Sequence, residues 1–436
     1  MNKVQNLHNQ LKRKSFSSHL MNQFIYSIIF LCLSACDSTG QSTQPNILPA
    51  SSEMTIVNAK DSLQVIPGAN NTSAYFPQLR NKNIALVVNQ TSAIGKTHLV
   101  DSMLKAGLHI KRIFAPEHGF RGTADAGEEI LDGKDLKTGI PLTSLYGKKQ
   151  KPDSSDLVGI DEIVFDIQDV GVRFYTYISS LHYLMEACAK YKVPLLVLDR
   201  PNPNGWYVDG FVLNDSFKSF VGVDKIAIVH GMTVAELATM INAEKWLANN
   251  MTCDLSYVLC QNYEHGKHYS LPINPSPNLR SDRAIYLYPS LCYFEGTEIS
   301  VGRGTNFPFL IFGHPLYKGL KNITYTFTPL ATKGAKNPPM INQMCYGWKL
   351  LEDDSMFEDK AGLINWNYLI KAYRKFPIKD KFWLQNNFTD KLAGTDRLRK
   401  MIIAGKSANE IRASYAMELE KFKALRKKYL LYKDFE

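Results

Sequence analysis

The sequence lacks the short motifs that bind nucleotides or activate a serine. No GxxxxGK[ST] phosphate-binding loop and no GxSxG nucleophile elbow occurs in its 436 residues. The glycine-rich stretch 301–304 (VGRG) has neither the third glycine nor the following helix of a dinucleotide-binding fingerprint. These absences argue against a nucleotide-dependent enzyme and a serine hydrolase, and they leave carboxylates as the main source of chemistry.

Cysteines are few and lack the spacing of a metal site. Of the seven, Cys32 and Cys36 lie near the N-terminus, and no CxxC pair occurs among the rest. We therefore expect no zinc site and no cofactor. One disulfide is possible in an oxidising compartment, and Cys253–Cys260 is the favoured pair because these cysteines are nearest to each other.

The formal charge of +10 falls to +6 when the basic residues Lys3, Lys12, Arg13 and Lys14 of the N-terminal segment are set aside. The remaining basic residues are spread out, except for a cluster within 421–428 that we interpret as a solvated helix face. No nucleic-acid-binding motif is present, so we expect no nucleic-acid partner.

The N-terminus has the pattern of a secretory signal. A basic region precedes the apolar run 24–33, and Leu33-Ser34-Ala35-Cys36 resembles a bacterial lipobox. The run is too short to span a membrane, so we favour a lipid on Cys36 over a plain cleaved signal. We expect residues 1–36 to be the signal, 37–54 to be a flexible tether, and the protein to lie in the cell envelope, on the outer membrane facing the periplasm.

Short apolar runs alternate with helical patterns from residue 84 onward. The runs expected to be buried strands are 84–89, 110–115, 162–167, 195–198 and 226–229. Helices are expected at 97–106, at 175–190 and after Thr233, which can form a capping box with Glu236. This alternation predicts an α/β fold in which helices cover both faces of a parallel sheet.

A polar cluster follows each expected strand. The clusters are Asn89–Gln90, Glu117–His118, Gln168–Asp169, Asp199–Arg200 and His230. Because the carboxyl ends of parallel strands lie along one edge of a sheet, we expect these side chains to converge there. A solvated turn is the alternative for any one cluster, and the convergence of five favours a site.

A long polar segment, 121–159, is expected to be a functional loop.

After about residue 284 the sequence becomes rich in glycine and aromatic residues. The proline-rich stretch 272–280 is the expected crossing from a domain at 55–284 to a second, α+β domain at 285–436, where helices are expected at 366–373 and 408–429.

Carboxylates and arginines gather at these turns. Hydrolysis of a glycosidic bond needs a carboxylic acid and usually a second carboxylate, and the candidates are Glu117, Asp169, Asp199, Glu295 and Glu298. His118 and His230 are candidate bases, although a single histidine is more often a hydrogen-bonded fixture. The nearby arginines suit a substrate carboxylate, or else pair with neighbouring acids; they are Arg121, Arg173, Arg200, Arg280 and Arg303.

Several of these stretches, in the same order, resemble the exo-β-N-acetylmuramidase family called NamZ. They are 114–122 (FAPEHGFRG), 165–177 (FDIQDVGVRFYTY), 198–205 (LDRPNPNG), 230–238 (HGMTVAELA), 275–279 (PSPNL), 294–297 (FEGT) and 302–305 (GRGT). The chain departs from the family pattern at 271–274 (LPIN), where an aromatic-containing stretch is expected, and at Ala235, where glycine is commoner.

The resemblance implies a Rossmann-like domain, a smaller C-terminal domain and an active site in the cleft between them. It also implies release of β-1,4-linked N-acetylmuramic acid (MurNAc) from the non-reducing end of peptidoglycan fragments that also contain N-acetylglucosamine (GlcNAc). Glu117 matches the acid of the family's PEHG stretch and is the expected catalytic carboxyl. Asp169 is the first candidate for its partner, and Glu295 is the second.

The remaining site residues complete this hypothesis. His118 is an expected catalytic neighbour. The residues expected to bind substrate are Arg121, Gln168, Arg173, Tyr175, Tyr177, Asp199, Arg200, Asn202, His230, Asn278, Glu295 and Arg303. An arginine would hold the lactyl carboxylate of MurNAc, and tyrosines would pack against the sugar.

Two alternatives stay open at this point. A surface lipoprotein that binds cell-wall glycan or a nucleotide without hydrolysis would keep the cleft and need no catalytic carboxyl. An amidase or esterase is a weaker alternative, and analysis of the products would separate it from a glycosidase.

Overall fold

The computed structural model describes residues 64–117, 119–120, 132–351 and 364–436. The expected signal, the tether and Cys36 lie outside these ranges, as do His118 and Arg121. Within them, no helix has the length and apolar character needed to cross a membrane.

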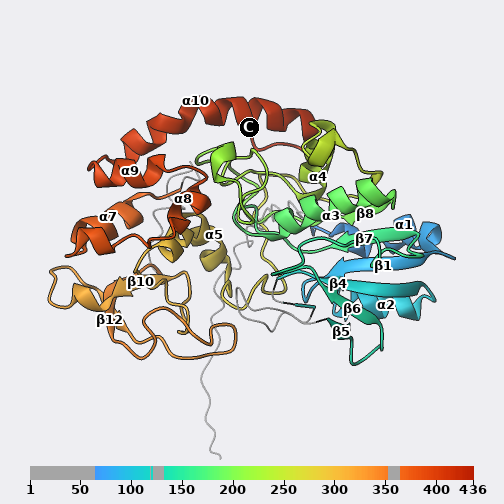
Figure 1. Cartoon of the computed structure of the whole chain (residues 1–436), viewed down its shortest axis with the longest axis horizontal. Coiled ribbons are helices and arrows are strands. Elements are labelled where there is room, and N and C mark those ends of the chain that lie inside the picture. Colours follow the sequence, from blue (N-terminus) through green and yellow to red (C-terminus); the bar gives the residue numbers. More distant parts are fainter. Residues whose placement is uncertain (1–63, 118, 121–131, 352–363) are drawn as a thin grey trace, which may run out of the picture. The chain divides into compact units, whose positions relative to one another are not determined.

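A seven-stranded sheet organises the first half of the described chain (Figure 1). In spatial order its strands are β5 (Gly133–Lys134), β6 (Pro141–Ser144), β4 (His109–Ala115), β1 (Asn83–Val88), β7 (Glu162–Asp166), β8 (Leu195–Leu198) and β9 (Leu255–Val258). Every pair of neighbours is parallel except β5 with β6. Numbered along the chain, the parallel strands have the order 3-2-1-4-5-6, which is the Rossmann arrangement with its topological switch point between β1 and β7. The predicted Rossmann-like sheet is confirmed.

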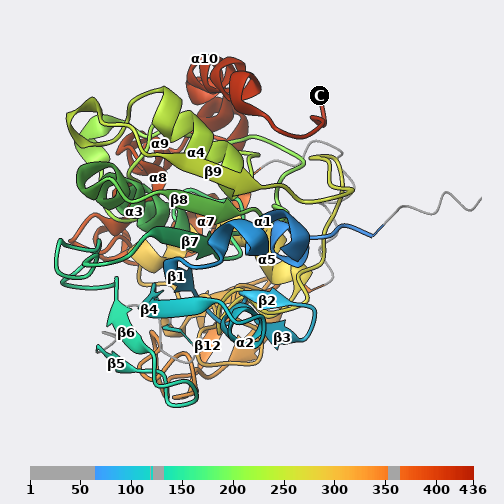
Figure 2. The same cartoon turned by 90° about the vertical axis from the view of Figure 1, so that its right-hand side faces the viewer.

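Helices cover both faces of this sheet (Figure 2). α1 (Thr72–Leu79) and α2 (Leu99–Lys105) pack on one face, and α3 (Tyr177–Tyr191) and α4 (Val234–Ala243) pack on the other. Alternate residues of β1 divide between the two cores: Leu86 and Val88 pack with α1 and α2, whereas Ala85 and Val87 pack with α3 and α4. A continuous apolar run therefore suits a strand that is buried on both sides.

Two details of the predicted topology are wrong. The run 226–229 is not a strand of the sheet: Val229 forms isolated antiparallel bridges with Val172 and Asp209, and β9 takes the outer position beside β8. Its residues are buried, so their apolar character reflects burial without strand pairing. The segment 121–159 is more than a loop, because it contains β6, which extends the sheet beyond β4.

A smaller α+β region follows, as predicted. Its antiparallel sheet has the order β10 (Ile311–His314), β12 (Cys345–Lys349) and β11 (Tyr325–Phe327). Its helices are α5 (Asp282–Leu291), α7 (Asn367–Lys375), α8 (Phe388–Ala393), α9 (Arg397–Ile403) and α10 (Ala408–Arg426). The short strands β2 (Ala93–Ile94) and β3 (Thr97–His98) complete the described strands, so the helix expected from residue 97 begins at Leu99.

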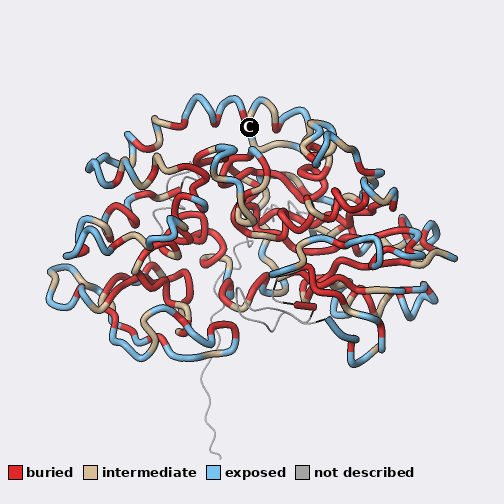
Figure 3. Tube along the Cα trace, in the orientation of Figure 1, coloured by how far each residue is buried: buried red, intermediate tan, exposed pale blue. Residues whose placement is uncertain are grey.

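One hydrophobic core joins the two regions. Phe174 and Leu184, on the Rossmann-like side, belong to the same buried cluster as Phe294, Phe312 and Trp366 from the C-terminal side. Figure 3 shows buried residues running through the interior of both regions. A shared core holds the facing walls of the two regions in a fixed relation.

The predicted Cys253–Cys260 disulfide is wrong, because the cysteines within the described ranges are all free and buried. The Cys260 Sγ lies 3.3 Å from the Asp199 carbonyl oxygen, and the Cys253 N–H donates to the Asn242 side chain over 2.7 Å. Cys253 precedes β9 and Cys260 follows it, so the strand separates the two cysteines that are neighbours along the chain.

Candidate active site

Glu117 lies directly beyond the carboxyl end of β4. The strand ends at Ala115, and Pro116 and Gly119 then form a tight turn in which the Gly119 N–H donates to the Pro116 carbonyl over 3.0 Å. Gly119 has a φ of +74°, which glycine adopts without strain. The Thr176 hydroxyl, at the start of α3, donates to the Glu117 Oε2 over 2.7 Å. Turn and hydrogen bond together hold this carboxylate in place.

The Glu117 side chain lines a cavity of about 850 Å³ whose walls come from both regions of the chain. The Rossmann-like side contributes residues that follow β4, β6 and β7, and the C-terminal side contributes η4 (Cys292–Gly296) and several loops. Its charged lining residues are Glu117, Glu295, Glu298, Arg303 and Lys336. This size and mixture of aromatic and polar lining are typical of a small-molecule site.

Tyr175 and Tyr177 line the same cavity, as the sequence predicts for sugar-packing residues. Their rings meet edge to face with centroids 5.0 Å apart, and the Tyr177 hydroxyl lies 3.4 Å from the Pro275 carbonyl oxygen. Burial, followed by the nearby Glu117 carboxylate, raises the pKa of Tyr177. Both phenols therefore remain neutral hydrogen-bonding groups beside Glu117.

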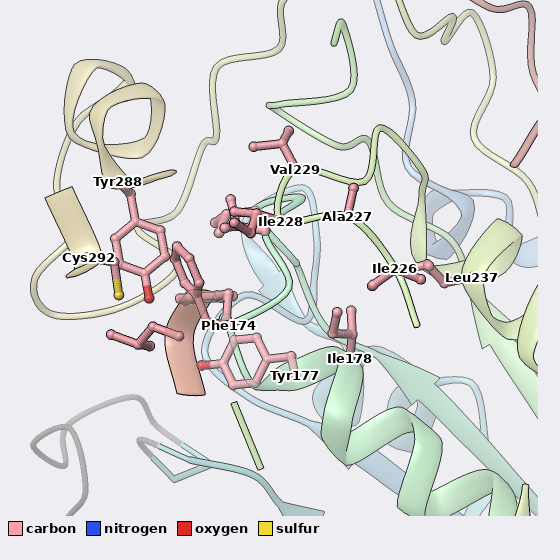
Figure 4. Packing of buried hydrophobic residues seen from close by; sticks show 14 of the residues in the cluster. Phe174, Tyr177, Ile178, Ile226, Ala227, Ile228, Val229, Leu237, Tyr288 and Cys292 are labelled. Atoms are coloured by element: carbon pink, nitrogen blue, oxygen red, sulfur yellow. The ribbon is translucent and has the colours of Figure 1, made fainter. Parts of the chain in front are cut away.

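Further aromatic rings line the cavity. Phe174 packs edge to face on Tyr288 of α5, with ring centroids 5.3 Å apart (Figure 4). The other buried rings of this wall are Phe294 and Phe309. Such rings make an apolar wall against which the C–H face of a sugar can pack.

Glu295 and Arg303 form an ion pair in the cavity wall. The Arg303 Nε donates to the Glu295 Oε1 over 2.6 Å, and the Cys292 Sγ lies 3.5 Å from the Glu295 Oε2. Burial opposes the charge of Arg303, but the Glu295 carboxylate outweighs it and raises the guanidinium pKa. The pair therefore places an oriented carboxylate in the same cavity as Glu117.

Glu298 and Thr176 also line the cavity. Glu298 was among the candidate carboxylates but was assigned no role, and Thr176 was not predicted. Glu298 is held by its backbone, whose N–H donates to the Phe382 carbonyl over 3.0 Å. Its position three residues after Glu295, in the same glycine-containing turn, was the available signal. For Thr176 the signal was its place between two tyrosines at the start of a helix.

Asp169 does not line the cavity. Its Oδ2 accepts from the Val170 N–H over 2.8 Å and from the Gly171 N–H over 3.3 Å, and its Oδ1 is buried with no hydrogen-bond partner among the described residues. Burial raises the pKa of Asp169 to about 7. The neighbouring Gln168 amide donates to the Asp169 and Pro201 carbonyls. These contacts shape the turn after β7.

Arg173 lies in the scaffold behind the cavity. Its guanidinium donates to the carbonyl oxygens of Phe211, Ile226, Leu392 and Ala393 at 2.7–3.1 Å. Burial lowers its pKa to about 10. Because Leu392 and Ala393 belong to α8, this one side chain ties the C-terminal region to the Rossmann-like region.

The predicted residues after β8 also form hydrogen bonds within the protein and do not face the cavity. Arg200 donates to both oxygens of Asp166, with its Nε 2.6 Å from Oδ1 and a second nitrogen 2.9 Å from Oδ2. Asp199 accepts from the Tyr432 hydroxyl over 2.6 Å and from the Ala235 N–H over 3.0 Å. Burial raises the pKa of Asp199 to about 6. None of these residues lines the cavity.

Asn202, His230 and Asn278 have structural partners too. The Asn202 amide donates to the Met232 carbonyl over 2.8 Å, and burial together with Arg426 lowers the pKa of His230 to about 3. The Asn278 amide donates to the Gly334 carbonyl over 2.8 Å. Gly334 lines the cavity, so Asn278 supports its wall from behind.

Of the residues that were assigned a catalytic or binding role from the sequence, the structure brings five to one cavity: Glu117, Tyr175, Tyr177, Glu295 and Arg303. His118 and Arg121 lie outside the described residues. The described part of the chain holds no group of three or more His, Cys, Asp or Glu side chains suited to a metal ion. The chemistry that this arrangement supports is acid–base catalysis by carboxylates on a ligand with hydroxyl groups and apolar faces.

Comparisons with known proteins agree along most of the chain. The family model for the N-terminal part of the exo-β-N-acetylmuramidase NamZ matches residues 84–283, and the model for its C-terminal part matches residues 286–432. The chain is 37% identical over 381 residues to the peptidoglycan β-N-acetylmuramidase NamZ of Bacillus subtilis (strain 168), which covers 82% of this chain and 89% of the relative.

Two crystal structures of DUF1343 family proteins from Bacteroides fragilis NCTC 9343 share the fold. The first is 48% identical, has a TM-score of 0.78, and covers 85% of this chain and 100% of that chain. The second is 26% identical, has a TM-score of 0.70, and covers 85% of this chain and 99% of that chain. Fold, ordered motifs and sequence identity lead to one conclusion: the chain belongs to the NamZ family of exo-β-N-acetylmuramidases.

Proposed function

We propose that this protein is an exo-acting glycoside hydrolase that releases β-1,4-linked MurNAc from the non-reducing end of peptidoglycan fragments. The relative from B. subtilis is named as a peptidoglycan β-N-acetylmuramidase, and it matches most of the chain. The observation that carries the proposal is the place of Glu117, whose carboxylate lines the cavity while the Thr176 hydroxyl holds it in position.

Glu117 acts as the general acid in this proposal. As the bond between C1 of MurNAc and the glycosidic oxygen breaks, Glu117 transfers its proton to that oxygen, and the shortened saccharide leaves as an alcohol. Water then supplies the hydroxyl at C1, and its second proton returns to the Glu117 carboxylate. The hydrogen bond from Thr176 fixes the orientation of the carboxyl group through both transfers.

Glu295 is the favoured second carboxylate. It faces the cavity and is oriented by Arg303, whereas Asp169 is turned into backbone N–H groups behind the wall. A carboxylate that is held beside a buried guanidinium can stabilise the positive charge that develops at C1 in the transition state. We assign Asp169 to the shape of the turn after β7.

The substrate's own charge fits the cationic part of the wall. MurNAc differs from GlcNAc by a lactyl group, whose carboxylate can pair with Arg303 or Lys336. Recognition through a charged, hydrogen-bonded group separates two sugars of similar shape more strongly than apolar contact does.

The direct test is release of MurNAc from MurNAc–GlcNAc by the wild type and by Glu117→Gln. We expect the substitution to lower kcat by about 10²–10⁴-fold, because it removes the proton donor and keeps the side-chain volume. Wild-type turnover by a folded Glu117→Gln would refute the assignment. Binding of muropeptides by the wild type with no product, at high enzyme concentration, would instead favour a non-hydrolytic glycan-binding lipoprotein.

We also propose that a lipid on Cys36 anchors the protein in the cell envelope, on the outer membrane facing the periplasm. The support is the Leu33-Ser34-Ala35-Cys36 motif after a short apolar run. A Cys36→Ser protein should leave the membrane fraction for the soluble fraction, and wild-type distribution of this variant would argue against the anchor.

A further inference from the structure

A short hairpin forms part of the cavity mouth. Ser219 and Gly222 exchange two backbone hydrogen bonds, of 3.0 and 2.9 Å, so that Phe220 and Val221 form the tip. Both tip residues line the cavity and are half-buried. Two apolar residues at the tip of a tight hairpin lose little freedom when a ligand contacts them, because the backbone already holds them.

Buried charges hold the hairpin from below. The Asp224 carboxylate lies 2.9 Å from the Nδ1 of His182 in α3, and Glu186 lies 3.5 Å from the other ring nitrogen. At the base of the hairpin, Gly222 packs against the Arg173 side chain. Arg173 also donates to the Ile226 carbonyl over 2.8 Å, so the segment that follows the hairpin tip rests on fixed groups.

Phe220 is one ring of an aromatic row. Its ring meets the Tyr146 ring edge to face, with centroids 5.8 Å apart. Tyr183 of α3 is parallel to Phe220 with centroids 6.2 Å apart, and it supports Phe220 without lining the cavity itself. Tyr146 lies two residues beyond β6, the strand beside β4, so the row begins next to the strand that carries Glu117.

Exposure of the aromatic lining changes from one part of the cavity to the other. Phe174, Phe294 and Phe309 are 3%, 0% and 1% exposed, whereas Tyr146 and Phe220 are half-buried. An exo-acting enzyme needs a closed end for the terminal sugar and an open end for the rest of the chain. The buried rings suit the closed end, and the half-buried rings suit the open end.

We infer that Tyr146 and Phe220 form a stacking platform for the pyranose ring on the leaving-group side of the scissile bond. This inference rests on the proposed exo-muramidase activity. A β-linked pyranose presents a face of C–H groups, which packs favourably on the negative face of an aromatic ring. The platform would hold the GlcNAc that follows the terminal MurNAc, while the sugar's hydroxyl groups stay in water at the mouth.

The test compares the two sides of the bond in one assay. The substrate is the trisaccharide MurNAc–GlcNAc–MurNAc, and the inhibitors are its two products, MurNAc and GlcNAc–MurNAc. For Phe220→Leu, which keeps an apolar tip and removes the ring, we expect KM and the inhibition constant of GlcNAc–MurNAc to rise about tenfold. We expect kcat and the inhibition constant of MurNAc to stay within about twofold.

Tyr257→Ala is the matched control, because Tyr257 is an exposed aromatic residue of β9 that does not line the cavity. The inference fails if Phe220→Leu binds GlcNAc–MurNAc as the wild type does, or if MurNAc inhibition weakens equally. Calorimetric titration of GlcNAc–MurNAc into both proteins measures the same loss of affinity without turnover. A wild type that binds this disaccharide through Phe220 but releases no MurNAc would refute the proposed function and keep the platform.

Discussion

Two stretches of the same sheet edge carry ionisable side chains and use them in opposite ways. After β4, Glu117 faces a cavity and has a threonine hydroxyl as partner. After β8, Asp199 and Arg200 are 0% and 5% exposed. Asp199 accepts hydrogen bonds from Tyr432 and Ala235, and Arg200 donates to Asp166. Position at a strand end therefore does not distinguish a site from a scaffold.

Burial explains the difference. A charged group removed from water needs a full set of partners, and once it has them it has nothing left to offer a ligand. Asp199, after β8, is covered by Tyr432 from the end of the chain. Glu117, after β4, lines a cavity to which the C-terminal region contributes one wall. The two stretches should therefore respond differently to substitution, one in stability and the other in turnover.

The largest effect is expected from Arg200→Met. Removal of the guanidinium leaves the fully buried Asp166 carboxylate without its two hydrogen bonds, so the free energy of unfolding should fall by about 3–5 kcal/mol. Urea unfolding measures this loss. Lys225→Met is the control, because its ion pair with Asp215 is exposed and should contribute less than about 1 kcal/mol. Equal losses of unfolding free energy in Arg200→Met and Lys225→Met would show that burial does not make the pair after β8 special.

A smaller, pH-dependent effect is expected from His182, which belongs to the scaffold but supports the cavity mouth. Burial opposes its charge, yet Asp224 and Glu186 outweigh it and raise the pKa of His182 to about 9. Because the folded pKa lies above the ordinary value of about 6.5, this stabilisation is full below pH 6.5 and is lost as pH rises through 9.

Unfolding of wild type and His182→Gln at pH 6, 8 and 10 measures that contribution. The difference in the free energy of unfolding should shrink by on the order of 3 kcal/mol across this range. A difference that stays constant with pH would show that His182 is neutral in the folded protein. The inhibition constant of GlcNAc–MurNAc for the wild type should rise over the same pH range, because the Phe220 hairpin rests on the pair of His182 and Asp224.

The smallest effect is expected from Thr176→Val, which sharpens the comparison on the cavity side. Loss of the hydrogen bond to Glu117 should lower kcat/KM about tenfold, since a hydrogen bond to a charged group contributes about 1.5–3 kcal/mol and water can replace part of it. Thermal unfolding should change little, because valine matches threonine in shape. A loss of stability without a loss of turnover would place Thr176 in the scaffold.

Most of the fold was predictable because each signal was local. Buried parallel strands are apolar on both faces, and the runs at 84–89 and 195–198 showed this directly. The capping box of Thr233 and Glu236 was also correct. The run 226–229 misled because an apolar segment can be buried beside a sheet without pairing in it, and β9, half-exposed at the sheet edge, lacked that signal.

The site was predictable only in part, for a different reason. Glu117, Tyr175 and Tyr177 follow strands that were predicted to be parallel, so their convergence at one edge of the sheet could be inferred as well. Arg173 carried the same polar signal, but only the packing of α8 shows that backbone carbonyls claim its guanidinium. The place of Phe220 at the cavity depends on which distant segments share a wall, and local spacing does not encode that.

The switch point between β1 and β7 has a consequence for inferring ligands from topology. In Rossmann folds this crevice is where a dinucleotide lies. Here three hydrogen bonds cross this crevice: the Gln168 backbone N–H donates to the Thr91 hydroxyl, the Ser92 hydroxyl donates to the Asp166 carbonyl, and Arg200, just beyond β8, donates to the Ala93 carbonyl. The cavity at this sheet edge is instead lined by residues that follow β4, β6 and β7, among them Glu117, Tyr146 and Tyr177. A shape-based search that matched only this sheet would suggest a nucleotide, and the side chains at the crevice are what would correct it.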